Sequence, residues 1–239
     1  MNSLTITEIV GRSSQGVTRP FICRADDGYL YYVKGSGAGR RALIAETLAA
    51  PIGRALGLPV PEAAPAFVPK ELIAQSVRGD IDQLGSEFVF ASRAEPHVKE
   101  FALAQLPYIP TDLQARVLLF DYWIQNGDRS LTEHGGNPNL LWSHGTQTLS
   151  VIDHNLAFES AGTEEMWEHH VFRHARSQWD RAFKERLTPV MDAILNRIPE
   201  YWRALPEAWT EVDTGLSLTY VQSVLGRFKS NPAAFWAGS

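Results

Sequence analysis

The chain has 239 residues, of which 44% are hydrophobic, and its formal net charge is −5. This length is enough to bury one substantial core. The acidic balance argues against a nucleic acid or an anionic membrane as a direct partner, because either ligand favours a basic face. The single cysteine, Cys23, excludes an intramolecular disulfide and a cysteine zinc cluster, and we expect it to be a small buried hydrophobe.

The sequence carries no signal for export or membrane insertion. Its first ten residues hold no basic segment followed by a long apolar stretch. No run of about 18 apolar residues occurs, because Arg, Asp or Pro interrupts the longest candidates. We therefore expect a cytoplasmic protein with no membrane partner.

Residues 1–95 are rich in short runs of β-forming residues. These runs are 6–10, 20–23, 28–34, 66–68 and 87–91. Asp-Asp-Gly at 26–28 is typical of a hairpin turn. Apolar residues recur at helical spacing over 43–56, and Gly57 and Pro59 prevent that helix from continuing. This part of the chain is therefore predicted to be a small β-rich lobe with one helix.

The chain changes character at Thr111. Thr111 and Asp112 suit a helix N-terminus, and residues 113–125 carry a nearly continuous apolar load. A helix that is apolar on most sides is normally buried in the middle of its domain. Two short strand-like pieces follow at 140–142 and 149–152.

The remainder, residues 164–235, looks helical, with breaks expected at Pro189, Pro199 and Pro206. The order of elements predicts an α+β fold of two lobes. The small β-rich N-lobe, which ends at residue 95, is expected to precede a mainly helical C-lobe at residues 96–239.

The first polar motif joins the first two predicted strands. It reads Gly-Arg-Ser-Ser-Gln-Gly at 11–16. The small residues Gly11, Ser13, Ser14 and Gly16 would let backbone N–H groups approach phosphate oxygens. A plain hairpin connection would have the same composition, so this motif alone leaves both interpretations open.

A lysine and a glutamate form the second motif. Lys34 ends the predicted strand at 28–34, and Glu46 follows twelve residues later in the predicted helix. A lysine at the end of a buried strand can hold a phosphate when a carboxylate fixes it. Each residue alone is typical of a solvated charge, whereas the pair favours a nucleotide site.

Three oxygen-bearing side chains lie around the two short strands of the second half. Asp128 follows the apolar helix, Asn139 opens the first strand, and Asp153 closes the second. Phosphoryl transfer needs a carboxylate to orient the attacking hydroxyl and hard oxygen ligands for magnesium. Because the strands are short, we expect Asn139 and Asp153 to converge on one spot.

These segments resemble a known family. Asp-Arg at 128–129, Asn-Leu-Leu at 139–141 and Ile-Asp-His at 152–154 resemble the catalytic and metal-binding segments of HipA-like kinases. They are more remotely similar to those of phosphoinositide kinases and protein kinases. The resemblance covers about residues 8–160 and implies a protein-kinase-like fold.

The resemblance implies a role for each charged residue. Asp128 would be the catalytic base, and Lys34, held by Glu46, would contact the α- and β-phosphates of ATP. Arg129 is expected to tie the catalytic loop to neighbouring carbonyls or carboxylates and to do no chemistry itself.

The resemblance also implies the cofactors ATP and Mg²⁺. Asn139 and Asp153 would bind the metal, with Asn137 as the alternative to Asn139. Eleven residues separate Asp128 from Asn139, so the loop at 130–136 is expected to bulge out.

Two further sets of residues complete the expected nucleotide site. Phe88, Phe90 and Ala91 would line the adenine slot if they lie at the connection between the lobes, although a buried edge strand would have the same composition. In some HipA-like toxins a serine of the first loop is autophosphorylated, which makes Ser13 and Ser14 candidates for this modification.

The chain is thus predicted to move the γ-phosphate of ATP onto Ser or Thr of a protein, including its own loop, with an antitoxin-like protein as a further partner. One alternative is a kinase for a small molecule or a lipid headgroup. Another is a catalytically silent nucleotide-binding module of a toxin–antitoxin or regulatory complex, which the long 130–136 loop supports and Asp128 opposes. His134 and His144 raise the idea of a transition-metal site, but their spacing matches no zinc pattern.

Overall fold

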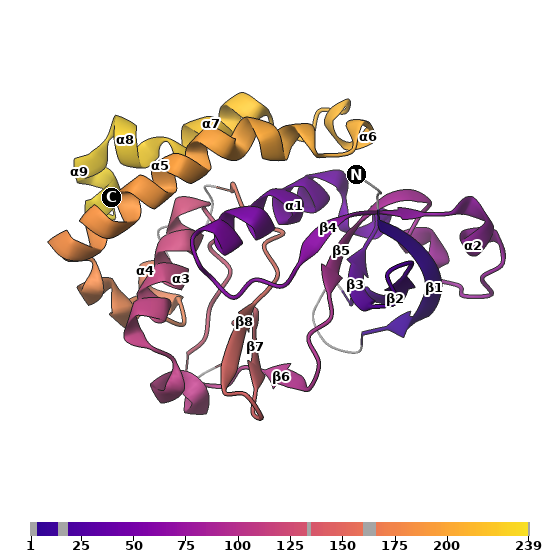
Figure 1. Cartoon of the computed structure of the whole chain (residues 1–239), viewed down its shortest axis with the longest axis horizontal. Helices are drawn as coiled ribbons and strands as arrows, with labels where there is room; N and C mark the ends of the chain where they lie inside the picture. Colours follow the sequence, from indigo (N-terminus) through magenta and orange to yellow (C-terminus); the bar gives the residue numbers. More distant parts are fainter. Residues whose placement is uncertain (1–3, 14–18, 133–134, 160–165, 239) are drawn as a thin grey trace.

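The computed structural model describes residues 4–13, 19–132, 135–159 and 166–238. It has a mixed α+β architecture, with a sheet-rich N-terminal part and a helical C-terminal part (Figure 1). The β-barrel of the N-terminal part lies at one end of the molecule (Figure 1). The long helices near the C-terminus lie along one long side of the molecule.

Five strands form the barrel. They are β1 (Leu4–Arg12), β2 (Phe21–Ala25), β3 (Leu30–Lys34), β4 (Ala63–Val68) and β5 (Glu87–Arg93). The hydrogen-bonded order is β1-β2-β3-β5-β4, and a parallel pairing of β1 with β4 closes the sheet. Each predicted run of β-forming residues falls within one of these strands or overlaps it. The interior is apolar and includes Cys23, whose predicted burial is confirmed.

Two connections in the N-terminal part bear on the site described below. Between β3 and the first long helix lies the short 3₁₀ helix η1 (Ser36–Ala38). Between β4 and β5 lie α2 (Lys70–Ala74) and the 3₁₀ helix η2 (Ile81–Gln83). The two 3₁₀ helices are in contact, because Ser36 Oγ donates to the Asp82 carbonyl at 2.7 Å.

Helices α1 (Arg40–Ala55) and α3 (Thr111–Trp123) form the centre of the larger core. The prediction of a mostly buried helix over 113–125 is confirmed, because α3 buries all but one residue of its run from Ala115 to Trp123. Gly53 permits close packing here: a Cβ at this position would lie 2.8 Å from Val60 and 3.1 Å from the Phe120 ring.

A three-stranded antiparallel sheet joins the barrel to the helical part. Its strands are β6 (Val98–Glu100), β7 (Leu140–Ser143) and β8 (Thr148–Val151), in the order β6-β7-β8. The 3₁₀ helix η3 (Leu103–Tyr108) leads from β6 to α3. Both strands predicted after the apolar helix are therefore confirmed.

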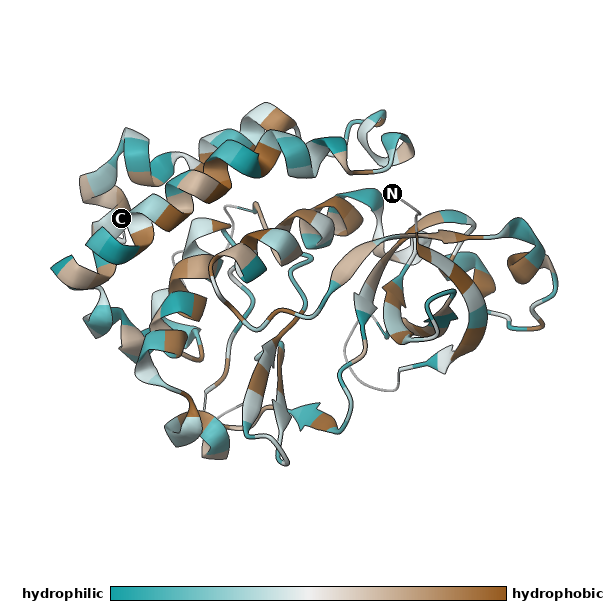
Figure 2. Cartoon of the chain, in the orientation of Figure 1, coloured by the Kyte–Doolittle hydropathy of each residue, from teal (hydrophilic) through white to brown (hydrophobic). Residues whose placement is uncertain are grey.

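The remaining helices are α4 (Met166–His169), the 3₁₀ helix η4 (Arg173–Gln178), α5 (Arg181–Arg203), α6 (Glu207–Thr210), α7 (Leu218–Leu225), α8 (Arg227–Ser230) and α9 (Pro232–Ala237). Helix α5 buries residues at steps of three or four, and apolar and polar patches alternate along its ribbon (Figure 2). The indole of Trp123 in α3 donates to the Leu225 carbonyl at 2.8 Å, which anchors α7.

The predicted breaks at Pro189 and Pro199 were wrong, because α5 runs through both prolines. Each proline removes one backbone donor, and packing of the buried side chains Leu187, Met191 and Ile198 on one face outweighs that loss. The break at Pro206 is confirmed, since this residue caps the start of α6.

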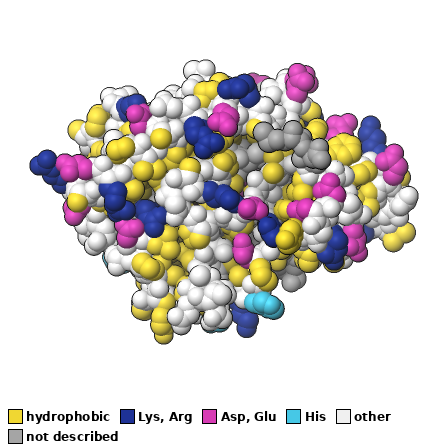
Figure 3. Space-filling view, viewed as in Figure 1, with side chains coloured by type: hydrophobic (Ala, Val, Ile, Leu, Met, Phe, Trp, Pro, Cys, Tyr) yellow, Lys and Arg dark blue, Asp and Glu magenta, His cyan; other side chains and the backbone are white. Residues whose placement is uncertain are grey.

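Acidic and basic side chains are interspersed over the face of the molecule shown in Figure 3. No helix in the described ranges is both long enough and apolar enough to cross a membrane.

Candidate functional site

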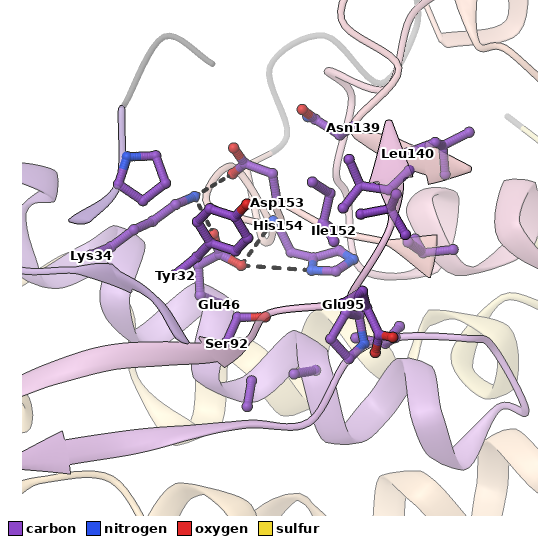
Figure 4. Close-up of a pocket in the computed structure, with 18 of the residues that line it drawn as sticks. Tyr32, Lys34, Glu46, Ser92, Glu95, Asn139, Leu140, Ile152, Asp153 and His154 are labelled. Carbon is purple, nitrogen blue, oxygen red and sulfur yellow. Dashed lines mark hydrogen bonds and ion pairs between the residues drawn. The ribbon is translucent and has the colours of Figure 1, made fainter. Parts of the chain in front are cut away.

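A pocket lies between the barrel and the C-terminal part. Its walls come from β3, α1, the end of β5 and the linker after it, and from the segments that flank β7 and β8 (Figure 4). The polar side chains that line it include Ser13, Lys34, Glu46, Asn139 and Asp153. The pocket therefore gathers residues from both halves of the chain.

Lys34 is the first charged residue of the site. It ends β3, is buried, and donates to Glu46 Oε1 of α1 at 2.5 Å and to Asp153 Oδ1 at 2.7 Å (Figure 4). The second oxygen of Glu46 accepts the backbone N–H of His154 at 3.0 Å. One lysine thus links the barrel, α1 and the segment after β8, which confirms the predicted contact of Lys34 with Glu46.

The charges of this cluster stabilise one another. Burial alone would lower the pKa of Lys34, but the carboxylates of Glu46 and Asp153 outweigh burial and raise that pKa. Burial would likewise raise the pKa of Glu46, but the Lys34 charge and the bond from His154 hold it well below its usual range. Burial raises the pKa of Asp153, and the Lys34 charge opposes that shift.

Asp128 lies in the turn after α3. Its Oδ2 accepts a hydrogen bond from Asn139 Nδ2 at 3.0 Å. Its Oδ1 is buried and has no hydrogen-bond partner in the described part of the chain. Burial raises the pKa of Asp128 to about 6, with Arg129 opposing the shift and Asp153 adding to it. A buried carboxylate oxygen without a donor is suited to accept a proton or a bond from a ligand.

Asn139 and Asp153 are brought together by strand pairing. Asn139 precedes β7 and Asp153 follows β8 by two residues, and the two strands pair antiparallel with Leu140 opposite Val151. The two residues therefore lie at the same end of the hairpin. Both have a left-handed backbone, with φ of 47° for Asn139 and 55° for Asp153. Asn and Asp adopt this conformation more readily than other residues with a side chain, because their short polar groups can form local hydrogen bonds.

Arg129 fixes the backbone beside both residues. Its guanidinium is fully buried, and Nη1 donates to the carbonyls of Asn139 at 2.5 Å and Ile152 at 3.2 Å. A further bond joins Nη1 to the Pro138 carbonyl at 3.1 Å. The predicted contacts of Arg129 with neighbouring carbonyls are confirmed.

Asp121 of α3 holds Arg129 in turn. The carboxylate accepts from Arg129 Nε at 2.7 Å, from Asn126 Nδ2 at 2.9 Å and from His170 Nε2 at 3.0 Å. Because His170 Nδ1 accepts the backbone N–H of Phe172, the proton of the neutral ring is on Nε2. Burial alone would raise the pKa of Asp121, but the charge of Arg129 and the hydrogen bond from His170 outweigh burial and hold that pKa well below its usual range.

The residues predicted for the first loop are only partly described. Ser13 lines the pocket, and Gly11 lies within β1 outside the pocket wall. Ser14 and Gly16 lie outside the described residues.

The residues predicted for the adenine slot separate along β5. Phe90 lines the pocket. Phe88 packs edge-on against Phe67, with the ring centroids 5.9 Å apart, and Ala91 is buried in the barrel interior. The pocket wall continues instead through Ser92, Arg93 and Glu95, towards the linker to β6.

Two residues of this pocket wall, one aromatic and one polar, were not predicted from the sequence. Tyr32 and Ser92 pair across β3 and β5, and both line the pocket. The signal for Tyr32 was present in the alternation of the strand, because Tyr32 is two residues before Lys34 and so lies on the same face. Ser92 could be found only with the strand register.

The chemistry of the donor set fits magnesium. Among the described residues no group of three or more His, Cys, Asp and Glu is arranged to hold a metal. The predicted transition-metal site is therefore without support at His144, and His134 lies outside the described residues. The hard oxygens available are those of Asp153 and Asn139, with Asn137 also in the pocket wall. Magnesium in kinases is commonly held by one or two protein oxygens together with phosphates and waters.

Comparison with known proteins identifies the family. A family profile described as HipA-like kinase matches residues 6–239, so the chain belongs to the HipA-like kinase family. Among solved structures, the chain is similar to the proinflammatory kinase CtkA of Helicobacter pylori, with a TM-score of 0.58 and 12% sequence identity over 98% of this chain and 96% of that one. Among curated proteins no sequence gives a significant match. Family and fold together support a kinase function, which implies the use of ATP.

Proposed function

We propose that the chain is a two-lobed kinase, with an N-lobe at residues 1–95 and a C-lobe at 96–239, that transfers the γ-phosphate of ATP to a Ser or Thr hydroxyl of a protein. The observation that carries the proposal is the convergence in one pocket of the Lys34–Glu46 pair with Asn139 and Asp153, with Asp128 bonded to Asn139. Membership of the HipA-like kinase family supports the same reaction.

Each residue has a chemical task in this reaction. Lys34 contacts the α- and β-phosphates, since its ammonium is fixed by Glu46. Asn139 and Asp153 hold Mg²⁺, with Asn137 as the alternative to Asn139. The metal, when bound, neutralises phosphate charge.

Asp128 acts on the acceptor. The hydroxyl oxygen attacks the γ-phosphorus, the bond from that phosphorus to the β,γ-bridging oxygen breaks, and ADP leaves with the electron pair. The hydroxyl proton passes to Asp128 Oδ1, the buried oxygen without a partner in the described ranges. Asn139 holds the other oxygen of the carboxylate and so sets its orientation.

The first loop of the chain and a separate protein are the two candidate acceptors. Ser13 lines the same pocket as Lys34, which supports autophosphorylation of the first loop at Ser13 or at Ser14. A protein substrate and an antitoxin-like partner rest on family membership.

Transfer of radiolabelled γ-phosphate tests the proposal. The wild-type protein with ATP and Mg²⁺ should label itself or a generic Ser/Thr substrate such as casein, and Asp128→Ala should lower the rate by about 10³-fold because the general base is lost. The same variant should still bind a non-hydrolysable ATP analogue. Undiminished transfer by Asp128→Ala would contradict the assignment of the base. Binding of the analogue by the wild-type protein without any transfer would favour the silent nucleotide-binding module.

Mass spectrometry tests autophosphorylation separately. After incubation with ATP, the first loop of the wild-type protein should carry one phosphate, and comparison of Ser13→Ala with Ser14→Ala assigns the position. An unmodified loop in an active enzyme would remove autophosphorylation and leave the kinase assignment intact.

A further inference from the structure

Arg12, at the end of β1, uses every nitrogen of its guanidinium group. Nε donates to the Arg19 carbonyl at 2.5 Å, Nη1 to Asp80 Oδ2 at 3.0 Å, and Nη2 to Gln83 Oε1 at 2.6 Å. The backbone N–H of Ser13 donates to the Pro20 carbonyl at 2.9 Å. Arg12 therefore fixes both ends of the β1–β2 connection and attaches them to the segment between β4 and β5.

Residues 78–85 of that segment are themselves anchored on the barrel. Asp80 accepts from Arg12 and also from Arg78, whose Nε and Nη2 donate at 2.9 and 3.0 Å. The guanidinium carbons of Arg12 and Arg78 lie 4.7 and 5.7 Å from the centre of the buried Phe21 ring. Leu84 is buried in the barrel interior. These contacts give the 78–85 segment a fixed position.

The same segment packs against the chain that follows Lys34. The backbone N–H of Ser36 donates to the Leu84 carbonyl at 3.2 Å. A Cβ at Gly35 would lie 1.9 Å from the Leu84 carbonyl oxygen, so only glycine permits this approach. Residues 78–85 thus contact, at the same time, the Ser13 end of the first loop and the end of β3 that carries Lys34.

We propose that Arg12 is a positioning residue for the phosphates of the nucleotide. Through Asp80 and Gln83 it holds the Ser13 end of the β1–β2 connection at a fixed spacing from Lys34. Both Ser13 and Lys34 line the pocket, whereas Arg12 does not. This inference rests on the proposed binding of ATP in that pocket. Its consequence is that loss of the Arg12 contacts weakens binding of the triphosphate and leaves binding of the nucleoside unchanged.

Calorimetric titration with two probes tests this inference. The probes are a non-hydrolysable ATP analogue with Mg²⁺ and adenosine alone. Arg12→Gln should weaken binding of the analogue about tenfold, as expected for loss of a charged hydrogen bond, and should leave the affinity for adenosine at the wild-type value. Gln83→Ala removes one exposed partner of Arg12, and it should weaken binding of the analogue about threefold with little effect on folding.

A matched control comes from the same strand pair. Glu8 of β1 makes an exposed ion pair with Arg24 of β2, outside the pocket, so Glu8→Gln should bind both probes as the wild-type protein does. The inference is overturned if Arg12→Gln and Gln83→Ala bind the analogue as the wild-type protein does, or if they lose affinity for adenosine to the same extent. Failure of the wild-type protein to bind the analogue would overturn the proposed function, and this inference with it.

Discussion

Lys34 is a buried cation shared by two carboxylates that come from different elements. Glu46 belongs to α1, which follows Lys34 in the chain, and Asp153 lies 119 residues away, after β8. Removal of one partner from a buried ion pair leaves a charge that is poorly compensated. The three side chains are therefore expected to respond to substitution as one unit.

Glu46→Gln tests this coupling. Because Glu46 is buried and bonded to both Lys34 and the His154 backbone, we expect its loss to lower the free energy of unfolding by about 3 kcal/mol. The kcat/KM for ATP should fall by at least about tenfold, since Lys34 loses the group that orients it. Urea unfolding and steady-state kinetics measure the two effects.

The control for Glu46→Gln is Glu185→Gln. Glu185 makes an exposed ion pair with Arg181 one turn away in α5, which should contribute less than about 1 kcal/mol and nothing to activity. If the two substitutions changed the free energy of unfolding and kcat/KM equally, the expected coupling of Glu46 with Lys34 would be contradicted.

At the scale of elements, the connection from α3 to β7 shows which contacts of the site could be predicted from the sequence and which could not. Asp128, Asn139 and Asp153 could be assigned to one site because each lies next to a recognisable helix or strand. The contact of His170 with Asp121 could not be assigned from the sequence, since 49 residues of chain separate the two. One signal was available: Asp121 is an acidic residue inside a strongly apolar helix, and such a residue needs a buried partner.

The burial of His170 makes the free energy of unfolding depend on pH. Burial lowers the pKa of His170, so the folded protein keeps the ring neutral where the unfolded chain takes up a proton, below about pH 6.5. The unfolded state then binds more protons, and the free energy of unfolding falls as the pH decreases through this range. We expect wild-type protein to lose roughly 1 kcal/mol more than His170→Gln between pH 7.5 and pH 5.5.

Glutamine suits this comparison because its amide can donate to Asp121 and accept from Phe172, but it does not titrate. Urea unfolding at the two pH values gives the difference. The same loss in both proteins would mean that His170 does not carry the pH dependence.

The junction of β3 with η1 should tolerate no side chain at Gly35. An alanine Cβ would meet backbone atoms of Leu84, which cannot move away as a flexible side chain could. We expect Gly35→Ala to lower the free energy of unfolding by about 2 to 3 kcal/mol. Gly79→Ala lies in the neighbouring segment with no atom near its Cβ and should change stability by less than about 0.5 kcal/mol. Thermal unfolding of the two variants compares them, and equal melting temperatures would contradict the close contact.

For the whole molecule, the order of the helices and strands was predictable from the sequence, but the closure of the five strands into a barrel was not. Hydrophobic patterning located the five barrel strands and both central helices, because strand and helix periods are local properties. The parallel pairing of β1 with β4 joins residues about 60 positions apart, and no local pattern encodes it. The continuity of α5 through Pro189 also depended on packing partners in other helices.

The pocket between the two parts should make the stability of the whole molecule depend on nucleotide and metal together. A ligand that binds only the folded state, at about 100 times its Kd, raises the free energy of unfolding by about 2.7 kcal/mol. For a chain of this size, that corresponds to a rise in Tm of roughly 5 to 10 °C. The non-hydrolysable ATP analogue with Mg²⁺ should give this rise, and the analogue with EDTA should give a smaller one. Asp153→Asn should bring the two values together, because the charge proposed to bind the metal is lost. A rise that is independent of Mg²⁺ in the wild-type protein would contradict the assignment of Asn139 and Asp153 as metal ligands.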